Sequence, residues 1–198
     1  KDGYTAFMCV PDGDPHKIEP IFSRVKMLDF IGVDKQIDAI NNFLRDAKEN
    51  IGDNRFLLLS GPPGVGKTKL VEILTKQQGF ELLDYQMGDA NDMYVGQIER
   101  RIKSFFDSAK RSGEPKCLFF DEMDAICPRY EGQPRAGSFD PDKVVTLIQK
   151  ELDKLIETKV VVIGTTNYLL KIKEAIKNRA SVIEFILPSM HIRKLMIE

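Results

Sequence analysis

The sequence is poor in histidine and cysteine, the residues on which zinc sites and disulfide frameworks depend. Its 198 residues include two histidines, His16 and His191, and three cysteines, Cys9, Cys117 and Cys127. The cysteine number is odd and no C-x-x-C pair occurs, which argues against a disulfide scaffold and against a zinc site. We therefore expect an intracellular, reducing compartment. The cytoplasm is the first expectation, and the nucleus and an organelle lumen stay open.

Long hydrophobic runs and an excess of one charge are also missing. Apolar runs such as Val160-Val161-Val162-Ile163 fall far short of the roughly 20 residues of a membrane helix. The start, Lys1-Asp2-Gly3-Tyr4, has neither a secretory signal nor an initiator Met, so we expect upstream residues to have been removed or left out. Lys and Arg total 29 against 30 Asp and Glu, a net charge of −1. A dedicated duplex-binding domain usually has a basic excess, so nucleic acid is not favoured as the main partner.

The hydrophobic pattern alternates between short strands and amphipathic helices. A composition of 42% hydrophobic and 30% charged residues is ordinary for one globular domain with a buried core. Apolar residues at helical spacing predict helices over 34–49, 67–77, 96–109 and 144–155. Short apolar runs predict strands over 56–59, 80–85, 117–120, 160–164 and 182–187. Apolar strands separated by helices indicate a three-layer α/β/α domain, in which a parallel sheet is covered on both faces. Ligands bind such sheets at the carboxyl ends of the strands.

A glycine-rich loop follows the first predicted strand. The segment Gly61-Pro62-Pro63-Gly64-Val65-Gly66-Lys67-Thr68 matches the P-loop pattern G-x-x-x-x-G-K-[ST] between a strand and a helix. Backbone N–H groups of such a loop converge on phosphate oxygens, and the helix adds its positive end. We expect Lys67 to reach the β- and γ-phosphates of a nucleotide and Thr68 to contact Mg²⁺. The predicted nucleotide-binding residues of the loop are Pro63, Gly64, Val65, Gly66, Lys67, Thr68 and Lys69. The alternative, an incidental glycine-rich turn, is disfavoured by the complete spacing.

Polar residues also follow two later strands. Asp121 and Glu122 end the third predicted strand. Asp121 could hold the water shell of Mg²⁺, and Glu122 could orient and deprotonate the attacking water. Asn167 follows the fourth strand, where it could hydrogen-bond the γ-phosphate or that water. The alternatives are an acidic turn for the pair and an ordinary turn residue for the asparagine.

Together these motifs resemble the large subdomain of an AAA+ ATPase, of the AAA group of ring-forming remodelling enzymes, over about residues 22–198. Residues 61–68 resemble the Walker A motif, 118–124 (LFFDEMD) Walker B, and 164–167 (GTTN) the sensor-1 strand. Residues 29–34 (DFIGVD), which include Gly32, resemble the segment that lines the adenine pocket. The resemblance implies a five-stranded parallel sheet of order 5-1-4-3-2, with ATP and Mg²⁺ at a subunit interface of a hexameric ring. It implies an N-terminal arm over 1–21, the subdomain over 22–189 and the start of a helical lid over 190–198, within a larger protein.

Two more positions follow from the resemblance. Met93-Tyr94-Val95-Gly96 lies where the family has a pore loop, so Tyr94 and Val95 would grip a translocating polypeptide. The alternative is a surface aromatic at the start of a helix. Arg179 lies in the segment of the arginine finger and would stabilise charge on a neighbouring subunit's γ-phosphate, although Lys177 and Asn178 stand where many members have arginine. The alternative is a solvated cation at a helix end.

The sequence therefore predicts Mg²⁺-dependent ATP hydrolysis that drives remodelling or threading of a protein substrate. One alternative is an AAA+ motor that acts on nucleic acid, of the clamp-loader or initiator type. Another is a nucleotide-gated scaffold that binds ATP and assembles without appreciable hydrolysis. A P-loop kinase is a weaker alternative, because a kinase would not need the acidic pair, the asparagine and the distal arginine in this order.

Overall fold

The computed structural model describes residues 32–85, 97–111, 113–129 and 140–187. Nearly all of these belong to one compact unit, Lys35–Leu187. The described helices are α1 (Asp34–Lys48), α2 (Lys67–Gln77), α3 (Gln97–Lys110), α4 (Met123–Ile126), α5 (Pro141–Asp153), the 3-10 helix η4 (Leu169–Lys171) and α6 (Glu174–Lys177). The described strands are β1 (Phe56–Ser60), β2 (Glu81–Asp84), β3 (Lys116–Phe120), β4 (Val160–Thr166) and β5 (Ser181–Glu184). None of these helices is long and apolar enough to cross a bilayer.

The five described strands form one parallel sheet in the order β2-β3-β4-β1-β5. This confirms the predicted α/β fold and the strand order 5-1-4-3-2. In this order β3, β4 and β1 are direct neighbours at the centre of the sheet. The loops that follow these three strands therefore meet at one edge, the carboxyl edge, although they are far apart in the sequence.

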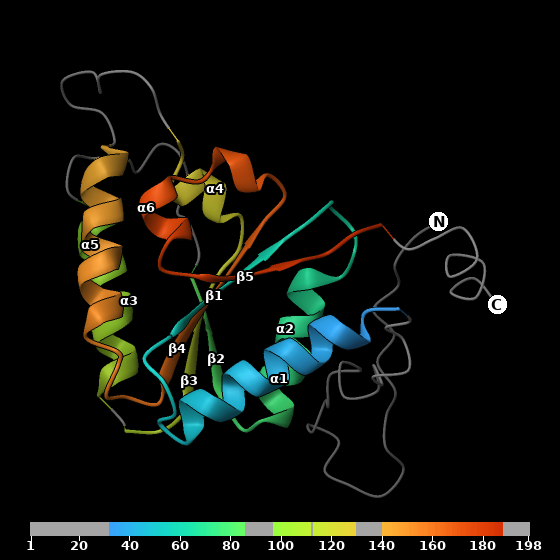
Figure 1. Cartoon of the computed structure of the whole chain (residues 1–198). Coiled ribbons are helices and arrows are strands. Elements are labelled where there is room, and N and C mark those ends of the chain that lie inside the picture. Colours follow the sequence, from blue (N-terminus) through green and yellow to red (C-terminus); the bar gives the residue numbers. More distant parts are fainter. Residues whose placement is uncertain (1–31, 86–96, 112, 130–139, 188–198) are drawn as a thin grey trace, which may run out of the picture. The chain divides into compact units, whose positions relative to one another are not determined.

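Helices cover both faces of the sheet, with α3 and α5 on one side and α1 and α2 on the other (Figure 1). Every residue of β1 and β4 is buried for this reason. The edge strands differ from the prediction of strands that are apolar and covered throughout. In β2 and β5 both end residues are exposed, because an edge strand has a neighbour on one side only.

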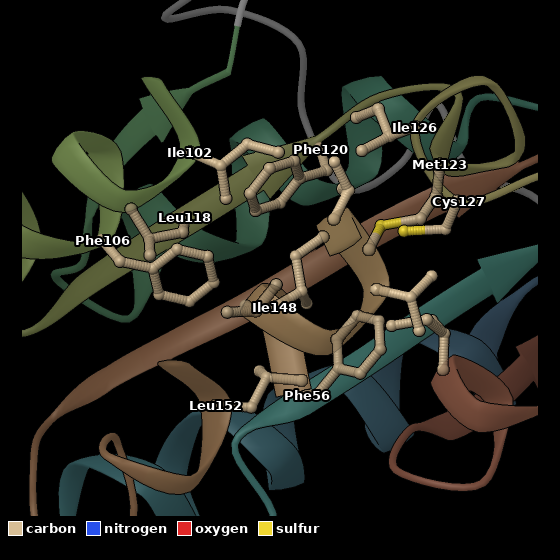
Figure 2. Close-up of a cluster of buried hydrophobic side chains, with 14 of the residues drawn as sticks. Phe56, Ile102, Phe106, Leu118, Phe120, Met123, Ile126, Cys127, Ile148 and Leu152 are labelled. Carbon is tan, nitrogen blue, oxygen red and sulfur yellow. The ribbon is translucent and has the colours of Figure 1, made fainter. Parts of the chain in front are cut away.

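Alternate strand residues divide the core between the two faces. Phe56, Leu118 and Phe120 point into a buried cluster that also takes side chains from α3 and α5 (Figure 2). Met123 and Ile126 of α4 enter the same cluster and are at most 1% exposed. The short helix that follows the predicted acidic pair is thus anchored in the core.

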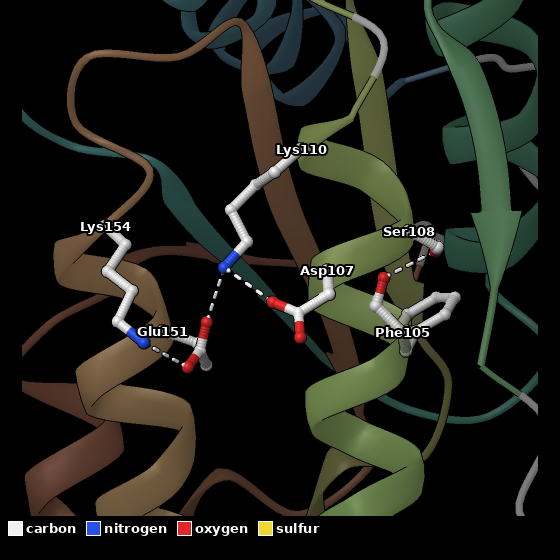
Figure 3. A network of polar contacts seen from close by, with 6 residues as sticks. All are labelled: Phe105, Asp107, Ser108, Lys110, Glu151 and Lys154. Atoms are coloured by element: carbon white, nitrogen blue, oxygen red, sulfur yellow. Dashed lines mark hydrogen bonds and ion pairs between the residues drawn. The ribbon is translucent and has the colours of Figure 1, made fainter.

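A polar network joins α3 to α5 beside this cluster (Figure 3). The buried carboxylate of Glu151 accepts from Lys110 Nζ and from Lys154 Nζ, each at 2.6 Å. Lys110 also pairs with Asp107 at 3.2 Å. Burial raises the pKa of Glu151, but the bonds and charges of the two lysines outweigh burial, so the net pKa lies below its ordinary value. The carboxylate is therefore ionised and paired inside the helical layer.

Several details of the predicted elements were wrong, including the helix predicted over 144–155, which spans Pro141–Asp153. The last strand ends at Glu184, three residues before the predicted end, and beyond it Ile186 and Leu187 are 76% and 60% exposed. Phe185 still donates its N–H to the carbonyl of Ser60 at 2.7 Å. The short helices α4, η4 and α6 were not predicted, because three or four residues are too few to show a helical period.

Candidate nucleotide site

The glycine-rich loop forms a turn between β1 and α2, as predicted. Gly64 and Gly66 have φ values of 78° and 86°, in the left-handed region that favours glycine. Gly66 is also the N-cap of α2, and it has no side chain to accept from the amides of the first helical turn. These amides have no acceptor within the helix, so they are available to an anion.

Lys67 is the first residue of α2, directly after this turn, and is only 7% exposed. Its ammonium donates to the carbonyls of Gly61 and Pro62 at 2.6 and 2.9 Å, and to Asn167 Oδ1 at 2.9 Å. Burial lowers the pKa of Lys67, and the carboxylates of Asp121 and Asp124 oppose that shift. The contact with Asn167 joins the loop after β1 to the end of β4, whereas the predicted bond of Asn167 to the γ-phosphate or water stays a prediction.

Asp121 follows β3 and connects two other elements. Its Oδ2 accepts from Thr68 Oγ1 of α2 at 3.2 Å. Its Oδ1 accepts from the hydroxyl of Thr165, the penultimate residue of β4. The structure therefore brings the two predicted magnesium residues, Thr68 and Asp121, within hydrogen-bonding distance.

Glu122 has an unusual backbone conformation, with φ 51° and ψ 53°. Few residues other than glycine adopt this left-handed region, and such residues cluster at functional sites. Its N–H donates to Asp121 Oδ1 at 3.1 Å and to Thr165 Oγ1 at 3.3 Å. The turn passes the chain from β3 into α4 and leaves Glu122 exposed.

These residues surround one cavity of about 360 Å³ at the carboxyl edge of the sheet. It is lined by Pro63, Gly64, Gly66, Lys67, Thr68, Lys69, Asp121, Glu122, Thr165, Thr166 and Asn167. Val65 is not among the lining residues, although it was predicted to bind nucleotide. The residues predicted from three separate motifs otherwise meet around the same space.

The oxygen donors fit Mg²⁺ better than a transition metal. The hydroxyl of Thr68 and the carboxylate of Asp121 are hard ligands, and Mg²⁺ commonly takes one or two protein oxygens together with water and phosphate. Within the described ranges, no three His, Cys, Asp or Glu side chains gather into a metal cage. The chemistry of the site thus suits a metal that arrives with phosphate.

Arg179 lies away from this cavity. It borders a second cavity, of about 370 Å³, together with Asn54, Phe56 and Asp153. Its guanidinium pairs with the carboxylate of Asp153. Since Arg179 precedes β5 and Asn54 precedes β1, this place is at the amino edge of the sheet, opposite the phosphate loop.

Three predicted residues have no tested place in the site. Tyr94 and Val95 lie outside the described residues. Gly32 has a φ of 81° and belongs to the other compact unit. Their roles stay predictions.

Comparison with known proteins decides the family. The family described as "ATPase family associated with various cellular activities (AAA)" matches residues 57–187. This match spans both the phosphate loop and the acidic turn. The chain belongs to the AAA family. The prediction of an AAA ATPase domain is therefore confirmed.

Several curated proteins are similar to this AAA domain. The mouse protein "Nuclear valosin-containing protein-like" is 36% identical over 119 residues, which are 59% of this chain and 13% of that protein. "Peroxisomal ATPase PEX6" of Dictyostelium discoideum is 35% identical over 119 residues, which are 59% of this chain and 10% of that protein. The bovine "ATPase family gene 2 protein homolog B" is 39% identical over 116 residues, 57% of this chain and 15% of that protein. The chain thus corresponds to a small part of each relative.

A solved structure supports the fold of the AAA domain. A chain in the E. coli MS115-1 HORMA:CdnC:Trip13 complex superposes with a TM-score of 0.72, covering 86% of this chain and 68% of that one. Its sequence identity is 18%, so the likeness concerns the fold alone.

Sequence reasoning missed two threonines of the AAA domain. Thr165 contacts both members of the acidic pair, and Thr166 Oγ1 donates to Asp124 Oδ1 at 2.7 Å. Both stand in the segment that was predicted to contain the asparagine, so the signal was present. The resemblance implies that β4 lies beside β3, but not the register that puts these hydroxyls beside the carboxylates.

Proposed function

We propose that this AAA domain hydrolyses ATP with Mg²⁺ at the subunit interfaces of a ring, and that hydrolysis drives remodelling or threading of a protein substrate. The observation that carries the proposal is the convergence of Lys67, Thr68, Asp121, Glu122 and Asn167 on one cavity. A module that only binds a nucleotide would need the phosphate loop alone. A carboxylate free to take a proton from water is needed only for hydrolysis.

Each side chain has a distinct role in this proposal. Lys67 and the amides at the start of α2 bind the phosphates, and the buried ammonium is held by the loop itself. Glu122 accepts a proton from the attacking water, and Asn167 orients that water or the γ-phosphate. Thr68 and Asp121 would hold Mg²⁺, which would neutralise charge on the phosphate oxygens. Lys69 and Gly32 complete the predicted nucleotide contacts.

The place of Arg179 supports the proposed ring. An arginine at the amino edge lies opposite the cavity that its own chain builds. It can act as an arginine finger only if a second subunit supplies the nucleotide. A head-to-tail contact of this kind closes into a ring when its rotation permits, and we propose a hexamer.

A polypeptide is the proposed substrate. The net charge of −1 does not favour nucleic acid as the partner. The segment with Tyr94 and Val95 resembles the pore loop through which AAA enzymes grip a chain. Salt-sensitive binding of DNA or RNA that stimulates turnover would favour the nucleic-acid motor instead.

The first experiment is the substitution Glu122→Gln. We expect the variant to bind ATP with unchanged affinity, and its phosphate release to fall by about 10²–10⁴-fold, because only the proton acceptor is removed. Glu49→Gln, which removes an exposed carboxylate just after α1, is the matched control and should keep full activity. Normal turnover by Glu122→Gln would contradict the catalytic assignment. Tight ATP binding without turnover in the unmodified protein would support the alternative of a nucleotide-gated scaffold.

A further inference from the structure

The side chain of Thr165 is buried between two functional segments of the proposed site. Thr165 is 1% exposed and lies near the end of β4. The parallel register pairs Phe120 with Gly164, so the next residues along, Asp121 and Thr165, lie beside each other. This register is what places a hydroxyl against the acidic turn.

The hydroxyl of Thr165 uses both its donor and its acceptor on that turn. It donates to Asp121 Oδ1, and it accepts from the N–H of Glu122 at 3.3 Å. The other oxygen of Asp121, Oδ2, is left facing Thr68 at 3.2 Å. One hydroxyl therefore sets which carboxylate oxygen faces α2 and also contacts the left-handed backbone of Glu122.

The neighbouring residue supports the same arrangement. Gly164 has no side chain, and a Cβ there would lie 2.9 Å from Met123 Sδ. Met123 therefore packs directly against β4, where it anchors the start of α4 just after Glu122. The hydrogen bonds of Thr165 and the packing of Met123 therefore hold the acidic turn on both sides of Glu122 and leave it little freedom to move.

We propose that Thr165 is a positioning residue that orients the Asp121 carboxylate toward Thr68 and holds the Glu122 backbone in its left-handed conformation. The inference rests on the proposed function, which assigns the roles of Asp121 and Glu122. It adds a residue that acts through its hydrogen bonds to Asp121 and Glu122. Without the hydroxyl, Asp121 can turn away from Thr68, and the metal-dependent part of nucleotide binding weakens while the phosphate loop stays intact.

The test compares Thr165→Val, which keeps the shape and removes the hydroxyl, with Thr165→Ser, which keeps the hydroxyl. Thr75→Val is the matched control, because Thr75 is equally buried and its hydroxyl donates to backbone carbonyls within α2. Three quantities are measured on each variant: phosphate release against Mg²⁺ concentration, binding of a fluorescent ATP analogue with Mg²⁺ and with EDTA, and the unfolding midpoint.

For Thr165→Val we expect kcat to fall and the Mg²⁺ concentration for half-maximal activity to rise, each by about tenfold or more, since a hydrogen bond to a charged group is lost. Binding in EDTA should be unchanged. Thr165→Ser should restore both quantities, and Thr75→Val should alter neither.

An unchanged Mg²⁺ requirement in Thr165→Val would overturn the inference, as would equal loss of binding with Mg²⁺ and with EDTA. If Thr165→Val does not fold, Thr165→Ala removes the hydroxyl without placing a methyl group near the carboxylate, and the same outcomes decide. The binding measurements need no turnover. If the unmodified protein hydrolyses no ATP but Thr165→Val still loses the Mg²⁺-dependent part of binding, the proposed function fails and the positioning role stands.

Discussion

At the scale of single residues, two glycines set how closely the site is packed. A Cβ at Gly61 would lie 2.3 Å from the carbonyl oxygen of Phe185, whereas a Cβ at Gly164 would meet Met123 Sδ at 2.9 Å. The first obstacle is backbone held by the bond from Phe185 to Ser60, and the second is a flexible thioether. The phosphate loop and the acidic turn thus depend on glycine to different degrees.

We expect Gly61→Ala to lower the free energy of unfolding by about 1–3 kcal/mol, because the backbone of Phe185, just after β5, must move. Gly164→Ala should cost less, since Met123 can change its rotamer. Denaturant unfolding of both variants measures the difference, and nucleotide binding shows whether the loop has shifted. A larger loss in Gly164→Ala would mean that Met123 is more rigidly held than its chemistry suggests.

At the scale of elements, the buried ion-pair network shows how α3 and α5 are joined without a purely apolar contact. Glu151 is 2% exposed at its side chain, whereas Lys110 and Lys154 are 21% and 56% exposed. The lysines keep part of their hydration, so the network costs less to bury than a fully desolvated ion pair. It fixes α5 against α3 beside the core cluster.

Glu151→Gln should therefore destabilise the protein at neutral pH, by about 1–2 kcal/mol once the exposure of the lysines is considered. The folded-state pKa of Glu151 lies below its ordinary value of 4.5, so its contribution is complete above that pH and is lost as the pH falls through the folded-state pKa. The difference between the variant and the unmodified protein should shrink below about pH 4.5. Urea unfolding at several pH values measures it.

The control for this measurement is Glu157→Gln, which changes an exposed residue in the loop after the same helix. It should leave the unfolding free energy within about 0.5 kcal/mol of the original at every pH. A Glu151→Gln loss that stays constant down to pH 3 would show that packing of the side chain, and not its charge, matters at this junction.

At the scale of the whole molecule, the sheet keeps two predicted functional regions apart. The phosphate loop and acidic turn lie at the carboxyl edge, and Arg179 lies at the amino edge. A chain built this way cannot bring its own arginine to its own cavity without breaking the sheet. The proposed assembly follows from that separation.

Mixing two inactive variants tests the shared site. Glu122→Gln keeps Arg179, and Arg179→Ala keeps Glu122, so each should be inactive alone. In rings mixed at equal amounts, about a quarter of the interfaces combine an intact Glu122 with an intact Arg179, and phosphate release should recover accordingly. In the unmodified protein the rate per subunit should rise with concentration. Full activity of Arg179→Ala alone would exclude Arg179 from the mechanism and favour the alternative, in which Arg179 is a solvated cation at a helix end.

Much of the fold could be predicted because its signals are local. Each long described helix and each strand showed its period or its apolar run within a dozen residues, and α2 has the predicted bounds. The edge strands were harder, because the exposure of β2 and β5 depends on what pairs with them. Helix α4 is held by the contacts of Met123 and Ile126 with distant residues, so its four residues have no local signal.

The sequence by itself determined which residues form the candidate site: a glycine-rich loop with Lys67 and Thr68, the carboxylates of Asp121 and Glu122, and Asn167, each after a strand. These are properties of short segments, which can be recognised from consecutive residues in the sequence. Tertiary structure alone decided the contacts between them, including the two hydrogen bonds of Thr165 and the distance of Arg179 from the cavity. Such contacts depend on strand order and register, which bring together residues more than 40 positions apart.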